Sequence, residues 1–236
     1  MKVLIDGDIV CYRCAASAEH DPVEVAILRT ENQVQEILHN CNQFSAIEGN
    51  LFLSGESNFR YDIFPEYKAN RTQPKPKWLQ ECREYLVLEW SAKVTEGYEA
   101  DDAIGIAAMV DTIIASDDKD LLQIPGTHYN LRTQKMLEVT NEEALWMFYF
   151  QLLVGDSADN IKGVKGIGKV KASRVLEVGM SEWDLFEVCR NLYNNDEEML
   201  MNGQLLHIMR HEKDLWTFPE EKLIKLEPEV QSVYMP

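Results

Sequence analysis

Acidic side chains recur in four short motifs of the sequence, each at the predicted end of a strand or start of a helix. So many carboxylates in one place repel one another, and burying them without partners costs free energy. Divalent cations offset that repulsion, and ligands that are all oxygen, with no His or Cys beside them, favour Mg²⁺ or Mn²⁺ over zinc. The candidate metal ligands are Asp6, Glu99, Asp101, Asp102, Asp118, Asp120, Asp156 and Asp159.

Two hard cations about 3.5 to 4 Å apart activate water as a nucleophile and stabilise the leaving oxygen of a phosphodiester. This is the chemistry that the acidic motifs predict. A single motif also has a simpler explanation, because an isolated Asp such as Asp102 or Asp156 can cap a helix. The recurrence of the motifs on one predicted sheet edge favours the metal site. The histidines neighbour no plausible nucleophile, so no Ser-His-Asp or Cys-His arrangement competes.

A glycine-rich segment from Gly163 to Ala172 has the features of a turn that binds phosphate. Its glycines allow a close backbone approach, and the helix that follows offers its N-terminal amides. With inward-pointing Val164 and Ile167 and flanking lysines, the segment predicts a helix-hairpin-helix that holds a DNA backbone without reading bases. A plain corner between two helices is the alternative. The candidate DNA contacts are Lys165, Gly166, Gly168, Lys169 and Lys171.

The net charge of -17 argues at first against a polyanionic partner, because phosphate binding normally depends on Lys and Arg. The distribution of charge changes that conclusion. Five bases and no acid lie between Lys162 and Arg174, and six bases against three acids lie between Arg60 and Arg83. Either segment alone is also explained as a solvated helix face. Together they predict two basic surfaces on an acidic protein.

The elements that must position these residues alternate between strand and helix in the first part of the chain. Helical spacing appears around residues 34–41, 78–86 and 100–110, and apolar runs predict strands at 2–6, 50–54, 92–95, 112–116 and 128–132. This alternation predicts an α/β fold with a mostly parallel central sheet flanked by helices. In such sheets ligands bind at the carboxyl ends of the strands.

From Asn141 onward the pattern is helical. We therefore expect an α/β catalytic core over residues 1–140, a helix-hairpin-helix region over 141–195, and a C-terminal segment over 196–236 that packs back on the core. No apolar run approaches the roughly 20 residues that span a bilayer, so no membrane association is expected. Five scattered cysteines suit a reducing compartment, and we expect a cytoplasmic location.

These residues resemble the 5′ nuclease family, which includes flap endonucleases, the 5′-nuclease domain of bacterial DNA polymerase I and phage 5′ exonucleases. The resemblance covers nearly the whole chain and is greatest to the exonucleases of short-tailed bacteriophages. It rests on Asp6-Gly7-Asp8, Tyr12-Arg13, Phe59-Arg60, Glu66 to Arg71, Glu99 to Asp102, Ser116 to Asp120, Gly155 to Ile161 with the hairpin that follows, and Gly203 to Trp216.

The resemblance implies a PIN-like core with a helix-hairpin-helix subdomain and a helical arch, the arch segment lying at about 60–90. It implies catalytic roles for Arg13, Lys68 and Arg71 at the scissile phosphate, and DNA binding by Tyr67. It also implies two or more Mg²⁺ or Mn²⁺ ions and a K⁺ ion held by backbone carbonyls of the hairpin, at Val164 and Ile167. The family usually has an Asp at the end of the second strand, whereas Glu56 is the only acid from Leu53 to Asn58.

The resulting hypothesis is a metal-dependent 5′-3′ exonuclease and structure-specific 5′ flap endonuclease that acts in phage DNA replication, in the host cytoplasm. Its expected substrates are duplex ends, gaps and flaps, with RNA in RNA–DNA hybrids as a further substrate, and no obligate protein partner is evident. One alternative is a non-catalytic DNA-end-binding protein, which would not need Asp118, Asp120, Asp156 and Asp159. Another is a ribonuclease on the same core, which would not need the hairpin.

Overall fold

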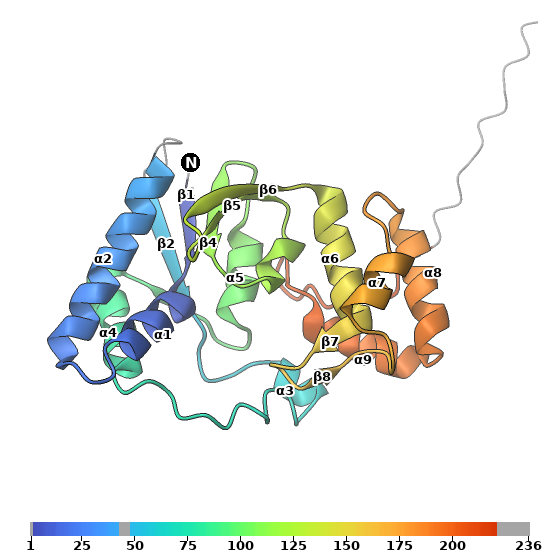
Figure 1. Cartoon of the computed structure of the whole chain (residues 1–236), viewed down its shortest axis with the longest axis horizontal. Helices are drawn as coiled ribbons and strands as arrows, with labels where there is room; N and C mark the ends of the chain where they lie inside the picture. Colours follow the sequence, from blue (N-terminus) through green and yellow to red (C-terminus); the bar gives the residue numbers. More distant parts are fainter. Residues whose placement is uncertain (1, 43–47, 221–236) are drawn as a thin grey trace, which may run out of the picture.

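A computed structural model describes residues 2–42 and 48–220, and within them six strands form one central sheet (Figure 1). Their spatial order is β3-β2-β1-β4-β5-β6. All neighbouring pairs from β3 to β5 are parallel, and β6 is antiparallel to β5. The mostly parallel sheet is confirmed, and only β6 was not expected. The strands are β1 (Lys2–Asp6), β2 (Glu48–Leu53), β3 (Lys93–Val94), β4 (Thr112–Ser116), β5 (Gly126–Asn130) and β6 (Lys135–Val139).

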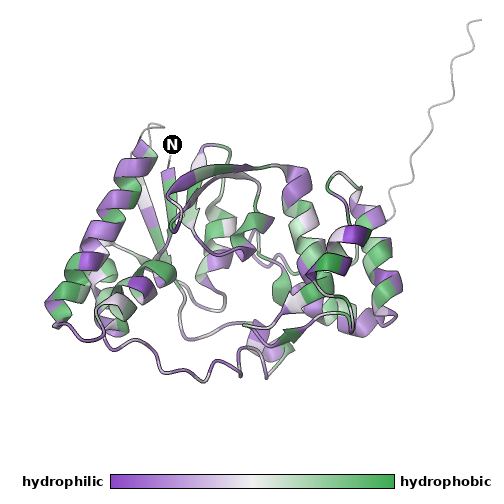
Figure 2. Ribbon diagram, viewed as in Figure 1, coloured by the Kyte–Doolittle hydropathy of each residue, from purple (hydrophilic) through white to green (hydrophobic). Residues whose placement is uncertain are grey.

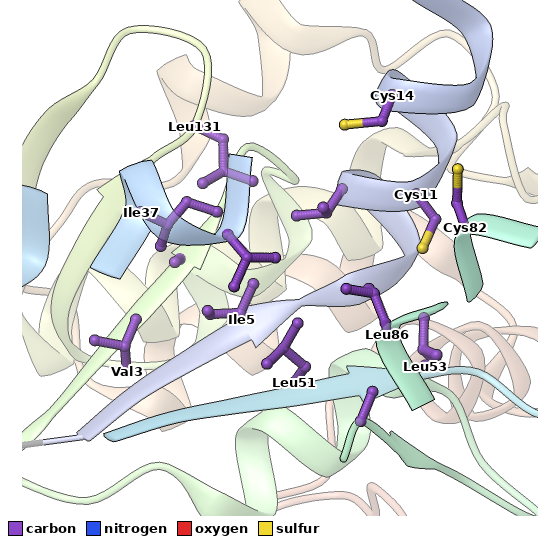
Figure 3. Packing of buried hydrophobic residues seen from close by; sticks show 14 of the residues in the cluster. Val3, Ile5, Cys11, Cys14, Ile37, Leu51, Leu53, Cys82, Leu86 and Leu131 are labelled. Carbon is purple, nitrogen blue, oxygen red and sulfur yellow. The ribbon is translucent and has the colours of Figure 1, made fainter. Parts of the chain in front are cut away.

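Helices cover both faces of this sheet. One face carries α1 (Gly7–Ser17), α2 (Val23–Cys41) and α4 (Leu79–Trp90), and the other carries α5 (Ala100–Ala107). Figure 3 shows Ile5 and Leu51 of the strands beside Ile37 and Leu86 of the helices. Leu4 packs on the opposite face, so successive residues of β1 are buried on alternate sides.

The second part of the chain is helical. It contains α6 (Asn141–Val154), α7 (Lys169–Val175), α8 (Glu182–Tyr193) and α9 (Asp196–Leu206), which share a hydrophobic core of their own. Thr140 begins α6 with a capping box, in which its side chain and that of Glu143 bond to each other's backbone amides. Figure 2 shows both hydrophilic and hydrophobic residues along these helices, as expected where one side of each helix is buried.

A pair of two-residue antiparallel strands precedes the predicted hairpin of residues 163–172, and the sequence did not predict it. It is formed by β7 (Gly155–Asp156) and β8 (Ile161–Lys162). Gly155 has a φ of 74°, and a Cβ there would lie 2.3 Å from the backbone nitrogen of Gly163. The tight approach therefore requires glycine at this position.

The segment after α9 packs back against the rest of the chain. Trp216 lies against Phe148 of α6 and against Gly203, where a Cβ would come within 2.0 Å of the indole ring. Residues 221–236 of the predicted C-terminal segment lie outside the described residues. The expected boundaries at residues 140 and 195, and the packing of residues 196–236 on the core, stay predictions.

Within the predicted arch segment of about 60–90, residues 64–78 are not helical. The segment contains the one-turn helix α3 (Arg60–Ile63), turns up to Asn70 and an extended strap of residues 71–77, before α4 begins at Leu79. Pro74 and Pro76 explain the difference, because proline lacks an amide donor and disfavours helical geometry in the residue before it. In Figure 1 the strap runs between α3 and α4, along the side of the molecule on which β7 and β8 lie. None of the described helices combines the length and the apolar composition that crossing a bilayer requires.

Candidate metal and nucleic-acid site

The carboxyl ends of β1 and β4 bring Asp6 and Asp118 to one edge, because these strands are parallel neighbours. Asp6 caps α1, and its Oδ1 accepts a hydrogen bond of 3.1 Å from the amide of Ile9. Ser116, the last residue of β4, donates from Oγ to Oδ2 of Asp6 at 2.8 Å and accepts from the amide of Asp118 at 3.0 Å. Ser116 therefore holds both acids in place. The sequence analysis missed it, although its position at a strand end was the available signal.

Three carboxylates at this edge, Asp6, Asp101 and Asp118, have no Lys, Arg or His partner among the described residues. Burial, together with the charges of Asp8 and Asp118, raises the pKa of Asp6 to about 7. Burial and repulsion from Asp6 and Asp118 also raise the pKa of Asp101 well above its usual range. Among the described residues no basic side chain pairs with these acids, so their ionised forms repel one another.

A second group of acids is joined by Lys119. Its Nζ lies 2.6 Å from Oδ2 of Asp156 and 3.0 Å from Oδ1 of Asp120. Burial opposes ionisation of Asp156, but the contact with Lys119 leaves its pKa below the usual value. Burial and the charge of Asp118 raise the pKa of Asp120 to about 6, in spite of Lys119. The contact with Lys119 therefore outweighs the effect of burial on the pKa of Asp156, but not on the pKa of Asp120.

A third group surrounds Tyr67, whose hydroxyl lies 2.9 Å from Oε2 of Glu99 and 2.8 Å from Oδ2 of Asp159. Lys68 pairs with Glu99 and lies 3.7 Å from Asp159, which also pairs with Arg71. Lys68 has a φ of 58°, an uncommon conformation for a residue with a side chain. Tyr67 was expected to contact DNA, but it is 2% exposed and holds two acids instead.

Asp102 was expected to be a metal ligand, and the structure places it elsewhere. It is fully buried and forms two hydrogen bonds with Arg60, at 2.6 Å and 2.9 Å. Its oxygens also accept from the backbone amides of Glu99 and Met209, both at 3.1 Å. Protein donors therefore satisfy both oxygens of the Asp102 carboxylate. Consecutive residues of a helix point in different directions, so Asp101 lines the pocket and Asp102 does not.

A pocket of about 350 Å³ lies between the acids and the hairpin region. It brings together Asp118 and Asp120 beyond β4, the bases Lys68 and Arg71, and Lys169 at the start of α7. Asp6 is 2% exposed and is not among the lining residues. Arg13 is not among its lining residues. The Arg13 guanidinium lies 3.6 Å from Asp117 and borders a separate groove between α1 and α2. The acids that line the pocket are Asp101, Asp118, Asp120, Asp156 and Asp159.

The hairpin of residues 163–172, which follows the β7–β8 pair, exposes the lysines that were predicted to contact DNA. These are Lys165, Lys169 and Lys171. Gly166 has a φ of 80°, so the turn requires the left-handed backbone that glycine adopts readily, and its carbonyl accepts from Nζ of Lys171 at 2.8 Å. Gly168 caps α7 from an extended conformation. Val164 and Ile167 pack against the helical core, as expected for the inner side of the turn.

The end of β2 carries no acid in the position that the resemblance led us to look for. Ser54 follows β2 directly, and Glu56 is exposed to solvent. No hydrogen bond or ion pair of the Glu56 side chain occurs within the described residues. In residues 2–42 and 48–220, moreover, no three Asp, Glu, His or Cys side chains converge on a single point.

Residues 1–149 match the family model of the 5′-3′ exonuclease N-terminal, resolvase-like domain. The 5′-3′ exonuclease of Mycoplasma genitalium is 29% identical over 234 residues, which cover 85% of this chain and 79% of that protein. The 5′-3′ exonuclease of Buchnera aphidicola subsp. Schizaphis graminum is 30% identical, with coverage of 84% and 74%.

DNA polymerase I of Bacillus caldotenax is 31% identical over 204 residues, but the match spans only 23% of that longer protein. Among solved structures, the zinc-bound T5 5′-exonuclease superposes with a TM-score of 0.70 at 18% identity, covering 87% of this chain and 88% of that one. The T5 D15 flap endonuclease with DNA and metal ions gives a TM-score of 0.65 at 16% identity, covering 86% and 88%. The two structures establish a shared fold.

Proposed function

The chain belongs to the 5′-3′ exonuclease family, and we propose that it hydrolyses DNA phosphodiesters near 5′ ends with divalent cations held by its strand-end acids. The observation that carries the proposal is the set Asp6, Asp101 and Asp118. These carboxylates lie near one another at the carboxyl edge of a parallel sheet, where their charges interact, without a basic partner among the described residues. Such a concentration of charge fits a cation site.

The donor set fits hard divalent cations in its chemistry. Every candidate ligand in the pocket is a carboxylate, and oxygen ligands favour Mg²⁺ or Mn²⁺. We propose Asp6, Asp101, Asp118 and Asp120 as the principal ligands. Such ions would lower the pKa of a bound water and stabilise the leaving oxygen of the phosphodiester.

The remaining acids stay candidate ligands under this proposal. Glu99 and Asp159 share the Tyr67 hydroxyl and the ammonium group of Lys68, and Asp156 pairs with Lys119. Asp102 is withdrawn from the ligand set, because Arg60 and two backbone amides satisfy its oxygens.

Lys68 and Arg71 are proposed to contact the phosphate that is cleaved. Both line the pocket, and both are held at its wall by acids. A cation beside a reacting phosphate stabilises charge that grows in the transition state. Arg13 is proposed to contact a phosphate farther along the DNA, because its guanidinium lies outside the pocket.

The hairpin is proposed to bind the duplex next to the cleavage site. Lys169 both begins α7 and lines the pocket, so the exposed lysines of the hairpin adjoin the acids. A backbone-binding surface of this kind accepts duplexes of any sequence. A K⁺ ion at the carbonyls of Val164 and Ile167 belongs to this proposal, although the Val164 carbonyl already accepts from the Ile167 amide at 3.0 Å.

The proposed substrates are duplex ends, gaps and 5′ flaps, with RNA in hybrids as a further substrate. Flap cleavage is supported by the fold shared with the T5 D15 flap endonuclease, which was solved with DNA and metal ions. The same likeness to phage proteins supports a role in phage DNA replication. Five free, buried cysteines suit the reducing cytoplasm, which is the proposed location.

The direct experiment uses 5′-labelled duplex, flap and hairpin DNA, each incubated with the protein in Mg²⁺ or in excess chelator. We expect Mg²⁺-dependent release of short products that carry 5′-phosphates. Binding without cleavage in Mg²⁺ and in Mn²⁺ would support the non-catalytic alternative. Cleavage of RNA alone would support the ribonuclease.

A further inference from the structure

A network of polar contacts joins α4 to the carboxylate edge, through residues that do not line the pocket. Asp8, the second residue of α1, accepts at Oδ2 from the amide of Ser54 at 2.8 Å. Its Oδ1 pairs with the guanidinium of Arg83, which lies on α4. The same guanidinium donates to the backbone carbonyl of Ser54. Asp8 and Arg83 therefore hold both backbone polar groups of Ser54, the residue that directly follows β2.

Ser54 carries the network onward to a third element. Its Oγ accepts from the amide of Ala100 at 2.9 Å, and Ala100 is the first residue of α5, between Glu99 and Asp101. At one end of the network, Asp8 stands two residues after Asp6. At the other end, Ala100 stands directly before Asp101. The network thus spans the distance between two acids that repel each other.

The backbones along this path are in direct contact, so a displacement at one end has little room to relax. A Cβ at Gly7 would lie 2.7 Å from the carbonyl oxygen of Phe52, and one at Gly55 would lie 1.9 Å from that of Thr95. Closely packed elements of this kind transmit small shifts to their neighbours. The side chains of Asp8 and Arg83 are 31% and 22% exposed, and a hydrogen-bonded ion pair with this degree of shielding is stronger than one in open solvent.

The end of the strap is hydrogen-bonded to the segment that follows α1. At the end of the strap, the amide of Lys77 donates to the carboxylate of Glu19 at 3.1 Å, and the indole of Trp78 donates to the carbonyl of Asp21 at 2.9 Å. Both acceptors lie just after α1. The start of α4 is therefore anchored, and Arg83 follows one turn into the helix.

We propose that Asp8 and Arg83 are positioning residues of the nuclease: through Ser54, their ion pair sets the separation of Asp6 and Asp101, and thereby the geometry in which these acids bind divalent cations. The inference rests on the proposed function. Neither residue contacts the phosphate in this arrangement. Arg83 also offsets part of the charge of Asp8, which adds to the negative charge around Asp6.

The test compares Arg83→Met, Arg83→Lys, Asp8→Asn and the double variant Arg83→Met with Asp8→Asn. Arg29→Met is the matched control, because Arg29 also pairs with an acid, Asp21, at 2.9 Å but lies on α2 away from the carboxylate edge. Three quantities are measured: the single-turnover cleavage rate across a Mg²⁺ titration, the DNA affinity in Ca²⁺, and the Tm.

We expect Arg83→Met to lower the single-turnover rate by about tenfold or more, because small misplacements of catalytic groups have effects of this size. The Mg²⁺ concentration for half-maximal rate should rise several-fold, while DNA affinity stays within about twofold and the Tm changes no more than in Arg29→Met. Arg83→Lys and Asp8→Asn should be intermediate. The double variant should be no slower than Arg83→Met, because both changes break one link.

Four results would overturn the inference. These are a wild-type rate in Arg83→Met, equal losses in rate and affinity, multiplicative losses in the double variant, and a lower Mg²⁺ requirement after removal of Arg83. The last would mean that Asp8 is a metal ligand released from its partner. If Arg83→Met does not fold, Arg83→Lys and Asp8→Asn carry the same test. A wild-type protein without metal-dependent cleavage would overturn the proposed function itself, whereas an active wild type with unaffected variants would overturn only the positioning role.

Discussion

Arg60 and Asp102 form a buried ion pair with two hydrogen bonds, 2.6 Å from Nη1 to Oδ2 and 2.9 Å from Nη2 to Oδ1. Arg60 also donates to the carbonyls of Leu205 and His207, both at 2.8 Å. One guanidinium therefore joins α3, α5 and the end of α9. Asp102 follows Asp101 in the sequence, but it belongs to this junction rather than to the pocket.

Asp102→Asn should consequently destabilise the fold without changing the metal requirement. Removing one partner of a buried pair costs about 3 to 5 kcal/mol, because the other charge is left uncompensated. We expect that loss in chemical unfolding, together with an unchanged Mg²⁺ concentration for half-maximal cleavage below the unfolding transition. Asp101→Asn is the comparison, and it should show the opposite pattern. A raised Mg²⁺ requirement in Asp102→Asn would restore Asp102 to the ligand set.

Lys68→Ala should lower the single-turnover rate more than it weakens DNA binding, because Lys68 lines the pocket beside the acids. Arg13→Ala should have a smaller effect on the rate than Lys68→Ala, since Arg13 lies next to Asp117 and outside the pocket. Single-turnover cleavage in Mg²⁺ and affinity in Ca²⁺ separate the two effects. Equal losses of rate and affinity in Lys68→Ala would make Lys68 an ordinary backbone contact.

Neutralising Lys169 and Lys171 together should flatten the dependence of log affinity on log salt, by about one unit for each phosphate that is no longer neutralised. Both side chains are exposed on the first turn of α7, directly after Gly168. Cleavage of bound duplex at saturating enzyme should change little. Affinity is measured in Ca²⁺ at several salt concentrations, with Lys135 and Lys213 neutralised as a control elsewhere on the surface. An unchanged salt slope would mean that the duplex lies on another surface.

Stability should depend on pH and on metal in a linked way. The folded pKa is about 7 for Asp6 and about 6 for Asp120, whereas an unfolded Asp ionises near pH 4. The folded protein therefore binds more protons than the unfolded chain between about pH 4 and pH 7. The contribution of these groups to stability falls as pH rises through that window, and it stays low above it.

A divalent cation that binds these acids should offset the loss at high pH. At a concentration tenfold above Kd, binding stabilises the fold by about 1.4 kcal/mol, which is roughly 3 to 6 °C in Tm for a chain of this size. We expect Mg²⁺ to raise the Tm more at pH 8 than at pH 5. Thermal unfolding with and without Mg²⁺ at both pH values measures this. Equal shifts at the two pH values would show that Mg²⁺ binds elsewhere.

The strand-end acids were predictable because parallel strands share one carboxyl edge, so Asp6 and Asp118 had to lie together once the strands were recognised. The different roles of Asp101 and Asp102 follow from helical geometry, which turns adjacent residues about 100° apart. That argument was available from the sequence. The prediction that every acid of the Glu99 to Asp102 motif is a metal ligand overlooked this difference in direction.

Other features depend on contacts that spacing does not reveal. Asp8 and Arg83 are 75 residues apart in the sequence, and Tyr67 and Asp159 are 92 residues apart. No local sequence pattern therefore predicts either contact. The strap differs from the expected arch because its two prolines outweigh the resemblance to a helical segment. For Arg13, the family pattern gave a position in the sequence, and the fold then placed the side chain beside Asp117.

Whether the strand-end acids hold the catalytic metal is decided by cleavage of 5′-labelled DNA by the wild type and by Asp118→Asn with Asp120→Asn, under single-turnover conditions in Mg²⁺ and with affinity measured in Ca²⁺. The variant removes charge from the acids but leaves Lys68, Arg71 and the hairpin intact. We predict loss of cleavage by at least about a thousandfold with affinity within a few-fold of wild type, because the metal site and the basic contacts are separate. Mg²⁺-dependent cleavage within about tenfold of the wild-type rate would contradict the assignment of these acids to the metal site.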